Sequence, residues 1–532
     1  MKRLMAEIIL ISVLFLGIML PFLGKPFHID DGFYIEIAKA IVHDPFRPYS
    51  FMINWGEVPA SSFGTYNPPL FSYFLAPVWA KWGSSEVPLH LVALLFAFSA
   101  VLSFYFLCRE IGIKPLTPTL VFLSVPFLAV GTNLMIDTPA LGLAIPSVLF
   151  FVVGVQREKL WPLILSGVLF SLAFLTKYSA LALFAPFFIY PFLSKKPGHM
   201  IPFVIGFAVF LLWNIYCFYI YGRPHFMNTH VVGAQTIYYL LLSPFTFVMI
   251  IGMTLPYAIL IIRPGLIFYF SLLFGTIASA IYLLVLNKEL EYLLNGLLAG
   301  AGVFLGTYLL LYLASHLELK KKGSYFTVTN DGLFIFMVLW IVMIVIMNLF
   351  FTPFVAFRYA FFMYPALIII MFKYSIFSKI TGKTMYMVIT CMIVVHLSLA
   401  YADFRHAQSY KNAAERFKKT YHDKTVWFLG HHGWHCYADA AGFKKWSKLD
   451  TRTLVRGDIV IIPRYGFKQA MTEDLKSKLK NTDSVRYELA WLPVRSHSDL
   501  SHAGFYASDI WRPPYIFSLK PLEVMDVYEV VR

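Results

Sequence analysis

Two adjacent acids, Asp30 and Asp31, stand directly after the first apolar run of the chain. A carboxylate held there could act as a general base toward a hydroxyl group. An isolated aspartate has a pKa of about 3.9, and a like-charged neighbour and apolar surroundings would both raise it toward the operating range. A structural role stays open, because an Asp before Gly32 would also cap the free N–H groups of a following helix.

Four potential metal ligands lie close together near the end of the chain, namely His431, His432, His435 and Cys436. Imidazole and thiolate groups bind divalent ions such as zinc. No second pair of ligands stands at a recognised zinc spacing, which favours a polar turn after a strand. We therefore assign no metal-binding residue and expect no certain cofactor, with a divalent cation left open.

The composition of the 532-residue chain predicts a membrane protein. Apolar residues make up 59% of the chain and charged residues 14%, whereas a soluble domain carries about 25% charged residues. The formal net charge of +15 does not indicate nucleic-acid binding, since Lys and Arg fall mostly in short loops between apolar runs, where they set membrane orientation. Glycine-rich phosphate loops are absent, so a nucleotide-driven pump has no support.

We predict a polytopic α-helical membrane protein with about thirteen spans, because apolar runs of roughly 17 to 23 residues recur along the chain. Their approximate limits are 4–23, 87–108, 115–132, 138–155, 160–176, 178–193, 200–221, 241–262, 264–286, 292–314, 332–351, 359–377 and 384–402. The first run lacks a small-residue cleavage site, which favours a retained span over a signal peptide.

The distribution of positive charge predicts the orientation. With the N-terminus in the cytoplasm, about fifteen Lys and Arg fall on the cytoplasmic side and about eight on the other, as the positive-inside rule requires. An odd number of spans then places the C-terminal region outside. We expect a multi-pass protein of the plasma (inner) membrane with an extracytoplasmic C-terminal domain.

Two segments depart from the pattern of short loops and set the domain division. Residues 1–403 are expected to form the transmembrane catalytic domain, and its outer loop 24–86 to hold two surface helices, Gly32–Val42 and Leu70–Trp82. The second helix follows two prolines, which suit a helix start.

Residues 404–532 are expected to form a small α/β domain. Thr425–Leu429 and Asp458–Ile462 have the composition of strands, and a helical pattern runs from Gln469 to Leu479.

The acids before Asp403 fall in loops or at the ends of spans. Those expected on the outer face close to lipid are Asp30, Asp31, Glu36, Asp44, Glu57, Glu86 and Asp137. Ion-coupled transporters place carboxylates within the membrane, where the ion is bound. This asymmetry favours chemistry at one membrane surface over transport through the middle.

Several motifs resemble a known family. His28-Ile-Asp-Asp-Gly-Phe-Tyr-Ile-Glu-Ile-Ala38 resembles the acidic motif after the first span of the protein O-mannosyltransferase and aminoarabinose transferase superfamily, whose members are GT-C glycosyltransferases. Further similarities follow in the same order: the proline motif Asn67-Pro-Pro-Leu-Phe-Ser-Tyr73, the Leu-Thr-Lys motif Phe174-Leu-Thr-Lys-Tyr178, Arg358-Tyr359 with Pro365, and the tail pieces Gly430-His-His-Gly-Trp434 and Ala503-Gly-Phe-Tyr506. The resemblance spans most of the chain and implies a GT-C fold.

The resemblance also implies site residues. Asp30 aligns with the catalytic Asp of the family's Asp-Glu pair, and Asp31 takes the second position. Asp137 matches the place of a second acid, although it could also cap the helix that continues at Pro139. Related enzymes often have Lys before the proline motif, contacting the carrier phosphate; this chain has Asn67, so phosphate binding must depend on other cations.

The implied reaction moves a hexosyl or pentosyl group from a polyprenyl phosphate to an acceptor hydroxyl on the outer face, with inversion at the anomeric carbon. It needs a carboxylate base and cations that stabilise the departing phosphate. The expected catalytic residues are Asp30, Asp31 and Asp137, and the expected substrate-binding residues are Asn67, Lys177, Arg223, Arg358 and Tyr359. Arginine suits phosphate through its planar fork, although each cation could instead lie at the membrane interface with its stem in lipid. The expected partners are the lipid-linked donor, membrane lipids and an acceptor glycan, lipid or protein, with no nucleic acid.

Two other functions stay open. A lipid or sugar transporter or flippase would need a central polar cavity and inverted repeats, and the sequence indicates neither. A non-catalytic membrane scaffold would not depend on Asp30.

Overall fold

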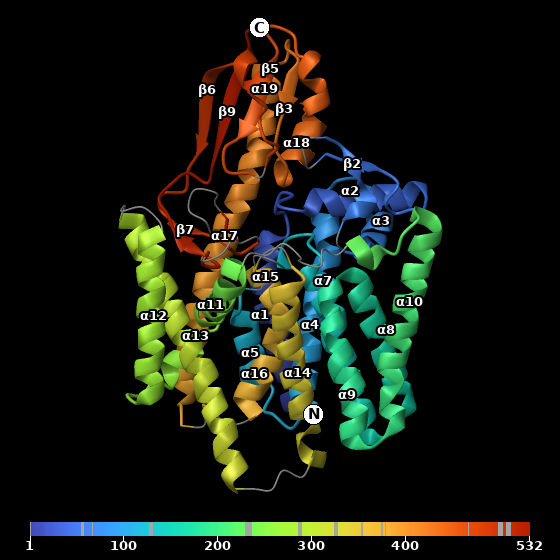
Figure 1. The fold of residues 1–532 in the computed structure, drawn as a ribbon, viewed down its shortest axis with the longest axis vertical. Helices are drawn as coiled ribbons and strands as arrows, with labels where there is room; N and C mark the ends of the chain where they lie inside the picture. Colours follow the sequence, from blue (N-terminus) through green and yellow to red (C-terminus); the bar gives the residue numbers. More distant parts are fainter. Residues whose placement is uncertain are drawn as a thin grey trace.

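The computed structural model describes residues 2–54, 58–65, 67–126, 131–228, 237–285, 290–323, 328–352, 355–373, 376–377, 379–466, 468–497, 504–506 and 512–532. Glu57, one of the acids expected near lipid, lies outside these ranges. The described chain forms a bundle of helices with a β-sheet beyond one end, and the C-terminus lies at the sheet (Figure 1).

The elements follow one another along the chain as listed here by their bounds. The α-helices are α1 (Lys2–Met19), α2 (Asp31–His43), α3 (Leu70–Trp82), α4 (Glu86–Glu110), α5 (Leu116–Ser124), α7 (Asp137–Arg157), α8 (Leu160–Thr176), α9 (Phe184–Ser194), α10 (Ile201–Tyr221), α11 (Ile237–Thr254), α12 (Leu266–Val285), α13 (Leu290–Gly323), α14 (Val328–Phe350), α15 (Phe357–Ala360), α16 (Tyr364–Lys373), α17 (Gly382–Thr420), α18 (Gly433–Ala441) and α19 (Glu473–Lys478). The 3₁₀ helices are η1 (Leu20–Phe22), η2 (Ser62–Gly64), η3 (Tyr178–Leu183), η4 (Pro197–Met200), η5 (His225–Asn228), η6 (Pro256–Leu260), η7 (Phe361–Met363) and η8 (Lys448–Arg452). The strands are β1 (Met52–Ile53), β2 (Ala60–Ser61), β3 (Val426–Phe428), β4 (Lys444–Lys445), β5 (Ile459–Pro463), β6 (Leu479–Tyr487), β7 (Val494–Arg495), β8 (Ile516–Phe517) and β9 (Glu523–Val530).

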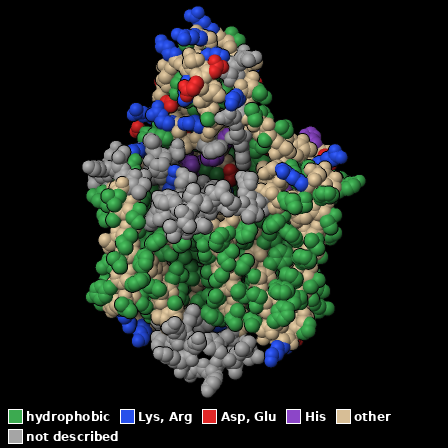
Figure 2. All heavy atoms as spheres, in the orientation of Figure 1, with side chains coloured by type: hydrophobic (Ala, Val, Ile, Leu, Met, Phe, Trp, Pro, Cys, Tyr) green, Lys and Arg blue, Asp and Glu red, His purple; other side chains and the backbone are tan. Residues whose placement is uncertain are grey.

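Within the described residues, eight helices are long and apolar enough to cross a membrane, and three further apolar helices are shorter. Apolar side chains cover the middle of the bundle surface (Figure 2), with Leu95 69% and Leu212 64% exposed. An apolar surface of this extent suits lipid, while helices satisfy the backbone internally. The prediction of a polytopic helical membrane protein is confirmed; the count of thirteen spans stays a prediction.

Several of the expected spans are interrupted within the described residues; the runs 178–193 and 241–262, for instance, contain the 3₁₀ helices η3 and η6. In the run 115–132, helix α5 ends at Ser124 because Val125 is extended before Pro126. The run 359–377 is divided into α15, η7 and α16.

The expected surface helices form almost as predicted, as α2 and α3, and they lie at the sheet end of the bundle (Figure 1). They pack against each other, and Ser72 Oγ donates a 2.9 Å hydrogen bond to the backbone oxygen of Tyr34. This packing fixes α2, and with it the residues at its start.

The C-terminal part contains a five-stranded mixed sheet of order β4-β3-β5-β9-β6. Strand β3 pairs in parallel with β4 and β5, while β9 is antiparallel to β5 and β6. Strands β3 and β5 confirm the predicted strand positions. Helix α19 is shorter than predicted, because the hydroxyl of Thr472 caps it by accepting from the backbone N–H of Leu475.

Helix α17 connects the bundle to the sheet and runs unbroken across residue 403, the expected domain boundary (Figure 1). Helix α18 packs tightly on the loop before α2: a Cβ added at Gly433 would lie 1.7 Å from the backbone oxygen of Phe27. The division at residue 403 stays a prediction, and the two parts share a close interface.

Candidate active site

Four charged side chains from four separate segments converge at the sheet end of the bundle. Asp30 precedes α2, Asp137 begins α7, Lys177 lies between α8 and η3, and Arg358 lies in α15. Arg358 Nη1 is 3.3 Å from Asp30 Oδ2 and 4.0 Å from Asp137 Oδ2. Lys177 Nζ forms an ion pair with Asp137 Oδ1. Two carboxylates and two cations therefore alternate in one chain of contacts.

The four charged side chains differ in how deeply they are buried. The side chains of Asp137 and Lys177 are 0% and 3% exposed, whereas those of Arg358 and Asp30 are 12% and 22% exposed. Asp30 is thus the acid that an outside molecule can reach. Asp137 Oδ2 accepts no hydrogen bond within the described part of the chain.

The backbone before Asp30 takes a conformation that its residue type disfavours. Ile29 has a φ of 50°, in the left-handed region, which a β-branched side chain adopts at a cost of about 1–3 kcal/mol. Asp30 is the N-cap of α2 by position, yet its side chain accepts no capping hydrogen bond. The capping role that the sequence left open is therefore wrong for Asp30, whose carboxylate turns to Arg358.

Asp31 is fully buried and faces away from this group. Its Oδ2 accepts from the backbone N–H of His28 at 2.8 Å, and its Oδ1 accepts from that of Leu134 at 2.9 Å. Asp31 therefore joins the loop before α2 to the loop before α7, instead of capping its own helix. Burial raises the pKa of Asp31 to about 7, although both backbone donors favour the charged form.

Asp137 occupies the first position of α7, with Ile136 as the N-cap. The alternative interpretation of Asp137 as the cap is therefore wrong in position, while its charge still suits the positive end of the helix.

An aromatic ring lies beside both cations. Lys177 Nζ is 4.4 Å from the centre of the Tyr359 ring, and the guanidinium carbon of Arg358 is 4.9 Å from it. Arg358 Nη2 also donates to Tyr359 Oη at 3.3 Å. Contacts of this kind hold a cation in place without neutralising it.

The surroundings of Asp30 make its carboxylate easier to protonate than that of a free aspartate. Burial raises the pKa of the Asp30 carboxyl above its ordinary value, and the Arg358 guanidinium opposes that shift. The pKa of a general base is useful when it lies near the operating pH.

The structure brings Asp30, Asp137, Lys177, Arg358 and Tyr359 together, but it places two predicted residues elsewhere. Arg223 is exposed and lies 5.7 Å from the Phe63 ring centre. The backbone oxygen of Asn67 accepts from Tyr49 Oη at 2.6 Å. Among the described residues, neither side chain has a hydrogen bond or ion pair to the convergent group, so their substrate-binding roles stay predictions.

A second polar network behind the first was not predicted. Lys25 Nζ contacts Asp403 Oδ2 and donates to Asn133 Oδ1 at 2.5 Å. Tyr506 Oη donates to Asp403 Oδ2 at 2.6 Å and accepts from Asn133 Nδ2 at 2.7 Å. All four side chains are at most 1% exposed. No local sequence pattern predicts these four residues, because each bonds to residues in a distant part of the chain.

The histidines of the C-terminal part contribute to this interior. Instead of a solvated polar turn, His431 is buried in the turn after β3, and His435 is buried on α18. The ring of His28 lies 5.2 Å from that of His406 and 6.3 Å from that of His497, centre to centre. Within the described ranges, no three His, Cys, Asp or Glu side chains are placed to hold a metal ion.

Figure 2 shows a hollow between the C-terminal part and the bundle, with histidine and acidic side chains inside it.

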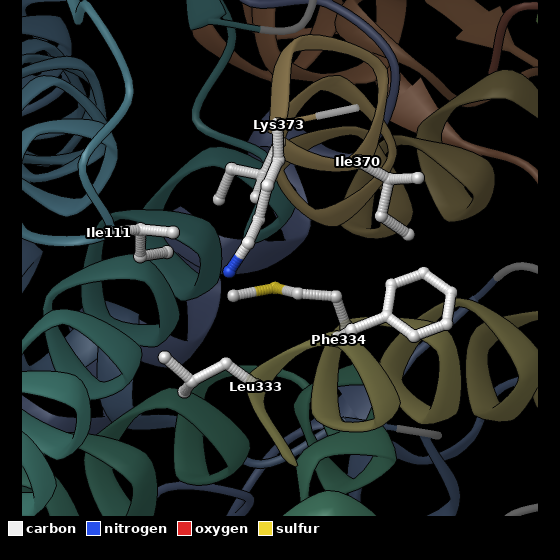
Figure 3. Close-up of a pocket in the computed structure, with 7 residues that line it drawn as sticks. Ile111, Leu333, Phe334, Ile370 and Lys373 are labelled. Atoms are coloured by element: carbon white, nitrogen blue, oxygen red, sulfur yellow. The ribbon is translucent and has the colours of Figure 1, made fainter. Parts of the chain in front are cut away.

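The structure also has a separate apolar pocket, which is drawn in Figure 3. Its lining consists of Ile111, Leu333, Phe334, Met337, Ile369, Ile370 and Lys373. Glu86, at the start of α4, bonds to Lys411 and Tyr437 of the C-terminal part, whereas Ile111 follows the other end of that 25-residue helix, about 37 Å away. The pocket therefore opens near the opposite end of the bundle.

Comparisons with known proteins agree with the motifs. Residues 66–217 match the family model described as dolichyl-phosphate-mannose-protein mannosyltransferase. This match confirms the resemblance to the protein O-mannosyltransferase-like family over the part that contains Asp137 and Lys177. No curated protein sequence matches the chain.

Two solved structures align with most of the chain. ArnT from Cupriavidus metallidurans bound to undecaprenyl phosphate aligns over 98% of this chain and 97% of its own, with 12% identity and a TM-score of 0.41. The archaeal oligosaccharyltransferase AglB from Archaeoglobus fulgidus, in complex with an inhibitory peptide and a dolichol-phosphate, aligns over 86% of this chain and 69% of its own, with 10% identity and a TM-score of 0.45.

Proposed function

We propose that this chain, which resembles the protein O-mannosyltransferase family over residues 66–217, is a membrane glycosyltransferase that moves a sugar from a polyprenyl phosphate to an acceptor hydroxyl. The observation that carries the proposal is the convergence of Asp30 with Arg358, Asp137 and Lys177. A partly exposed carboxylate and two cations are what the reaction requires.

In the proposed step, Asp30 takes the proton of the acceptor hydroxyl as that oxygen bonds to the anomeric carbon of the sugar. The bond between the anomeric carbon and the phosphate oxygen breaks, and its electron pair leaves with the polyprenyl phosphate. Attack opposite the leaving group inverts the anomeric configuration. The departing phosphate is a weak base, so it needs cations and no strong acid.

Arg358 is the best placed of the candidate phosphate ligands. It is 12% exposed and lies between the two carboxylates, and its planar fork can bond to phosphate and carboxylate at the same time. Lys177 supplies a second positive charge from behind, held by Asp137 and the Tyr359 ring. Asn67 and Arg223 would then contact parts of the donor farther from the reacting carbon.

Asp31 takes a positioning role in this proposal in place of the predicted catalytic one. Both of its oxygens accept from backbone N–H groups, so neither is directed at a substrate. By joining His28 to Leu134 it sets the distance between the loops that carry Asp30 and Asp137.

The expected topology would put this site on the outer side of the membrane. With the N-terminus in the cytoplasm of a plasma (inner) membrane, the sheet end of the bundle and the C-terminal domain 404–532 lie outside, and transfer occurs on the outer face. The family description names a dolichyl-phosphate mannose donor, which supports a hexose on a polyprenyl phosphate; the acceptor is a glycan, lipid or protein. A substituted-cysteine test at the exposed Asp44 and Arg157, at opposite ends of the bundle, would check the orientation.

The alternatives make different use of the same residues. A flippase or sugar transporter would need a polar path through the bundle, and a scaffold would not need Asp30. The concentration of charge at one end of the bundle favours surface chemistry over both.

The test is complementation of a deletion strain, followed by analysis of its envelope glycans and lipid-linked sugars. The proposal predicts that deletion leads to an accumulated lipid-linked donor and a missing glycan product, and that the wild-type chain restores both. Asp30→Asn should not restore them, although it inserts normally, while the matched control Asp44→Asn should. Asp44 is a suitable control because it lies at the far end of α2 and is 44% exposed. Restoration of the product by Asp30→Asn would refute the catalytic role.

A further inference from the structure

The C-terminal segment Gly504-Phe505-Tyr506 lies directly against the candidate site. Phe505 and Tyr506 are 0% and 1% exposed. Ala503, which belongs to the same sequence motif, lies outside the described residues. The segment contacts three of the backbone stretches that carry the convergent charges.

Its first contact is with the arginine. The backbone N–H of Phe357 donates to the oxygen of Gly504 at 3.3 Å, and that of Arg358 donates to the oxygen of Phe505 at 3.4 Å. The rings of Phe357 and Phe505 are 5.0 Å apart, centre to centre. The first turn of α15 therefore takes its position from the segment.

Its second contact is with side chains that hold the loops preceding the two acids. Tyr506 Oη bonds to Asn133 and to Asp403, and these two side chains share the ammonium group of Lys25. Lys25 lies five residues before Asp30 and Asn133 four residues before Asp137. The ring of four buried side chains thus anchors both loops that present carboxylates.

The two loops are also joined to each other beyond this ring. Asn133 is followed by Leu134, whose N–H donates to Asp31. The hydroxyl of Ser496, from the C-terminal part, donates to Asp403 Oδ1 at 2.7 Å, and His28 Nε2 lies 3.4 Å from the same oxygen. Every bond of this network is buried, so a lost partner is not replaced by bulk water.

From these contacts we infer that Tyr506 is a positioning residue of the transferase site, through which the C-terminal segment sets the distance between Arg358 and the two acids. This inference rests on the proposed function for its effect on catalysis. Its structural content stands apart from the reaction: the Tyr506 hydroxyl holds Asn133 and Asp403, and the backbone just before Tyr506 holds the stretch with Arg358.

The test uses Tyr506→Phe in the full-length protein, with Tyr515→Phe as the matched control. Tyr515 lies in the same C-terminal stretch, but its hydroxyl donates to the backbone oxygen of Met253 in α11 at 2.8 Å. Ser496→Ala is the second, milder variant, because it removes only the outer hydrogen bond of Asp403. The first measurement is hydrogen–deuterium exchange of peptides covering residues 24–31, 133–137 and 356–360.

Tyr506→Phe should raise exchange in all three stretches, Ser496→Ala should do so to a smaller extent, and Tyr515→Phe should leave them unchanged. In the transfer assay, Tyr506→Phe should lower kcat by about 10- to 100-fold with KM changed less than about threefold, since a displacement of about 1 Å costs up to 10²-fold. The acid limb of the pH profile should also move to higher pH, because a displaced Arg358 no longer lowers the pKa of Asp30. A variant that only unfolds more readily would lose amplitude with the limb in place.

Different results would overturn the positioning role of Tyr506 and the proposed transferase function. Unchanged exchange in the three stretches overturns the positioning role, whatever the activity. Absence of transfer by the wild-type protein with polyprenyl-phosphate sugars overturns the proposed function, while increased exchange still supports the positioning of these loops by Tyr506.

Discussion

The buried pair of Asp137 and Lys177 gives a prediction that does not depend on the reaction. Both side chains are at most 3% exposed, and Arg358 lies 4.0 Å from the second oxygen of Asp137. Asp137→Asn leaves two cations facing one partly exposed acid, so it should cost about 3–5 kcal/mol, the usual penalty for an uncompensated buried charge. Lys177→Met should cost less, because Arg358 still neutralises Asp137.

The double variant Asp137→Asn with Lys177→Met should be more stable than the sum of the single changes implies, by about 0.5–3 kcal/mol. The assay is denaturant unfolding of the reconstituted protein, followed by tryptophan fluorescence, with the order of the midpoints as the result. The matched control is Lys196→Met, which breaks the exposed pair with Glu158, whose side chains are 52% and 56% exposed. That change should move the unfolding midpoint much less than Asp137→Asn does, because exposed ion pairs contribute little to stability.

If Asp137→Asn were as mild as the exposed control, the pair would be solvated, which contradicts its burial. If the effects of the two single changes were additive, the two charges would not interact, which contradicts the ion pair.

Three further predictions follow from the loops and the C-terminal part. Activity should fall as the pH falls through the raised pKa of Asp30, above the ordinary Asp range, since only the ionised base accepts a proton; a kcat profile flat down to about pH 4 would contradict this. Burial lowers the pKa of His28 to about 4 and that of His497 to about 3, so the unfolded chain binds these protons first. The stability that these neutral histidines allow should be fully present above about pH 6.5 and decline below it, by up to about 1.4 kcal/mol per pH unit for each histidine. The test is a series of Tm values against pH, and a His497→Asn variant with an unchanged slope would contradict the prediction. Gly433→Ala places a Cβ 1.7 Å from the Phe27 oxygen, whereas a Cβ at Gly198 has nothing within 4 Å. Gly433→Ala should therefore lower both the Tm and the activity, and the control Gly198→Ala should lower neither. Equal Tm values for the two variants would contradict the close packing.

Local signals were sufficient for several elements. The two prolines before Leu70 and the apolar periodicity that follows placed α3 correctly at both ends. Short β-branched runs likewise placed β3 and β5. In each case the information lies within about a dozen neighbouring residues, where propensity and turn chemistry act.

The buried network could not be predicted in this way. Lys25 and Asp403 are 378 positions apart, and Asn133 and Tyr506 are 373 apart. A lysine that pairs inside the protein has the same local sequence as one at a membrane interface, and only the tertiary packing separates them. Likewise, the sequence left both capping and catalysis open for Asp30, and only the structure shows its carboxylate directed toward Arg358.

The central claim is that Asp30 takes the proton of an acceptor hydroxyl. Its most direct measurement compares the wild-type protein with Asp30→Asn in vesicles that contain a polyprenyl-phosphate hexose and an excess of acceptor. If Asp30 is the base, kcat falls at least about 10²-fold in Asp30→Asn, as expected for loss of a general base, while a photoreactive polyprenyl phosphate still labels both proteins equally. Transfer by Asp30→Asn at the wild-type rate would contradict it.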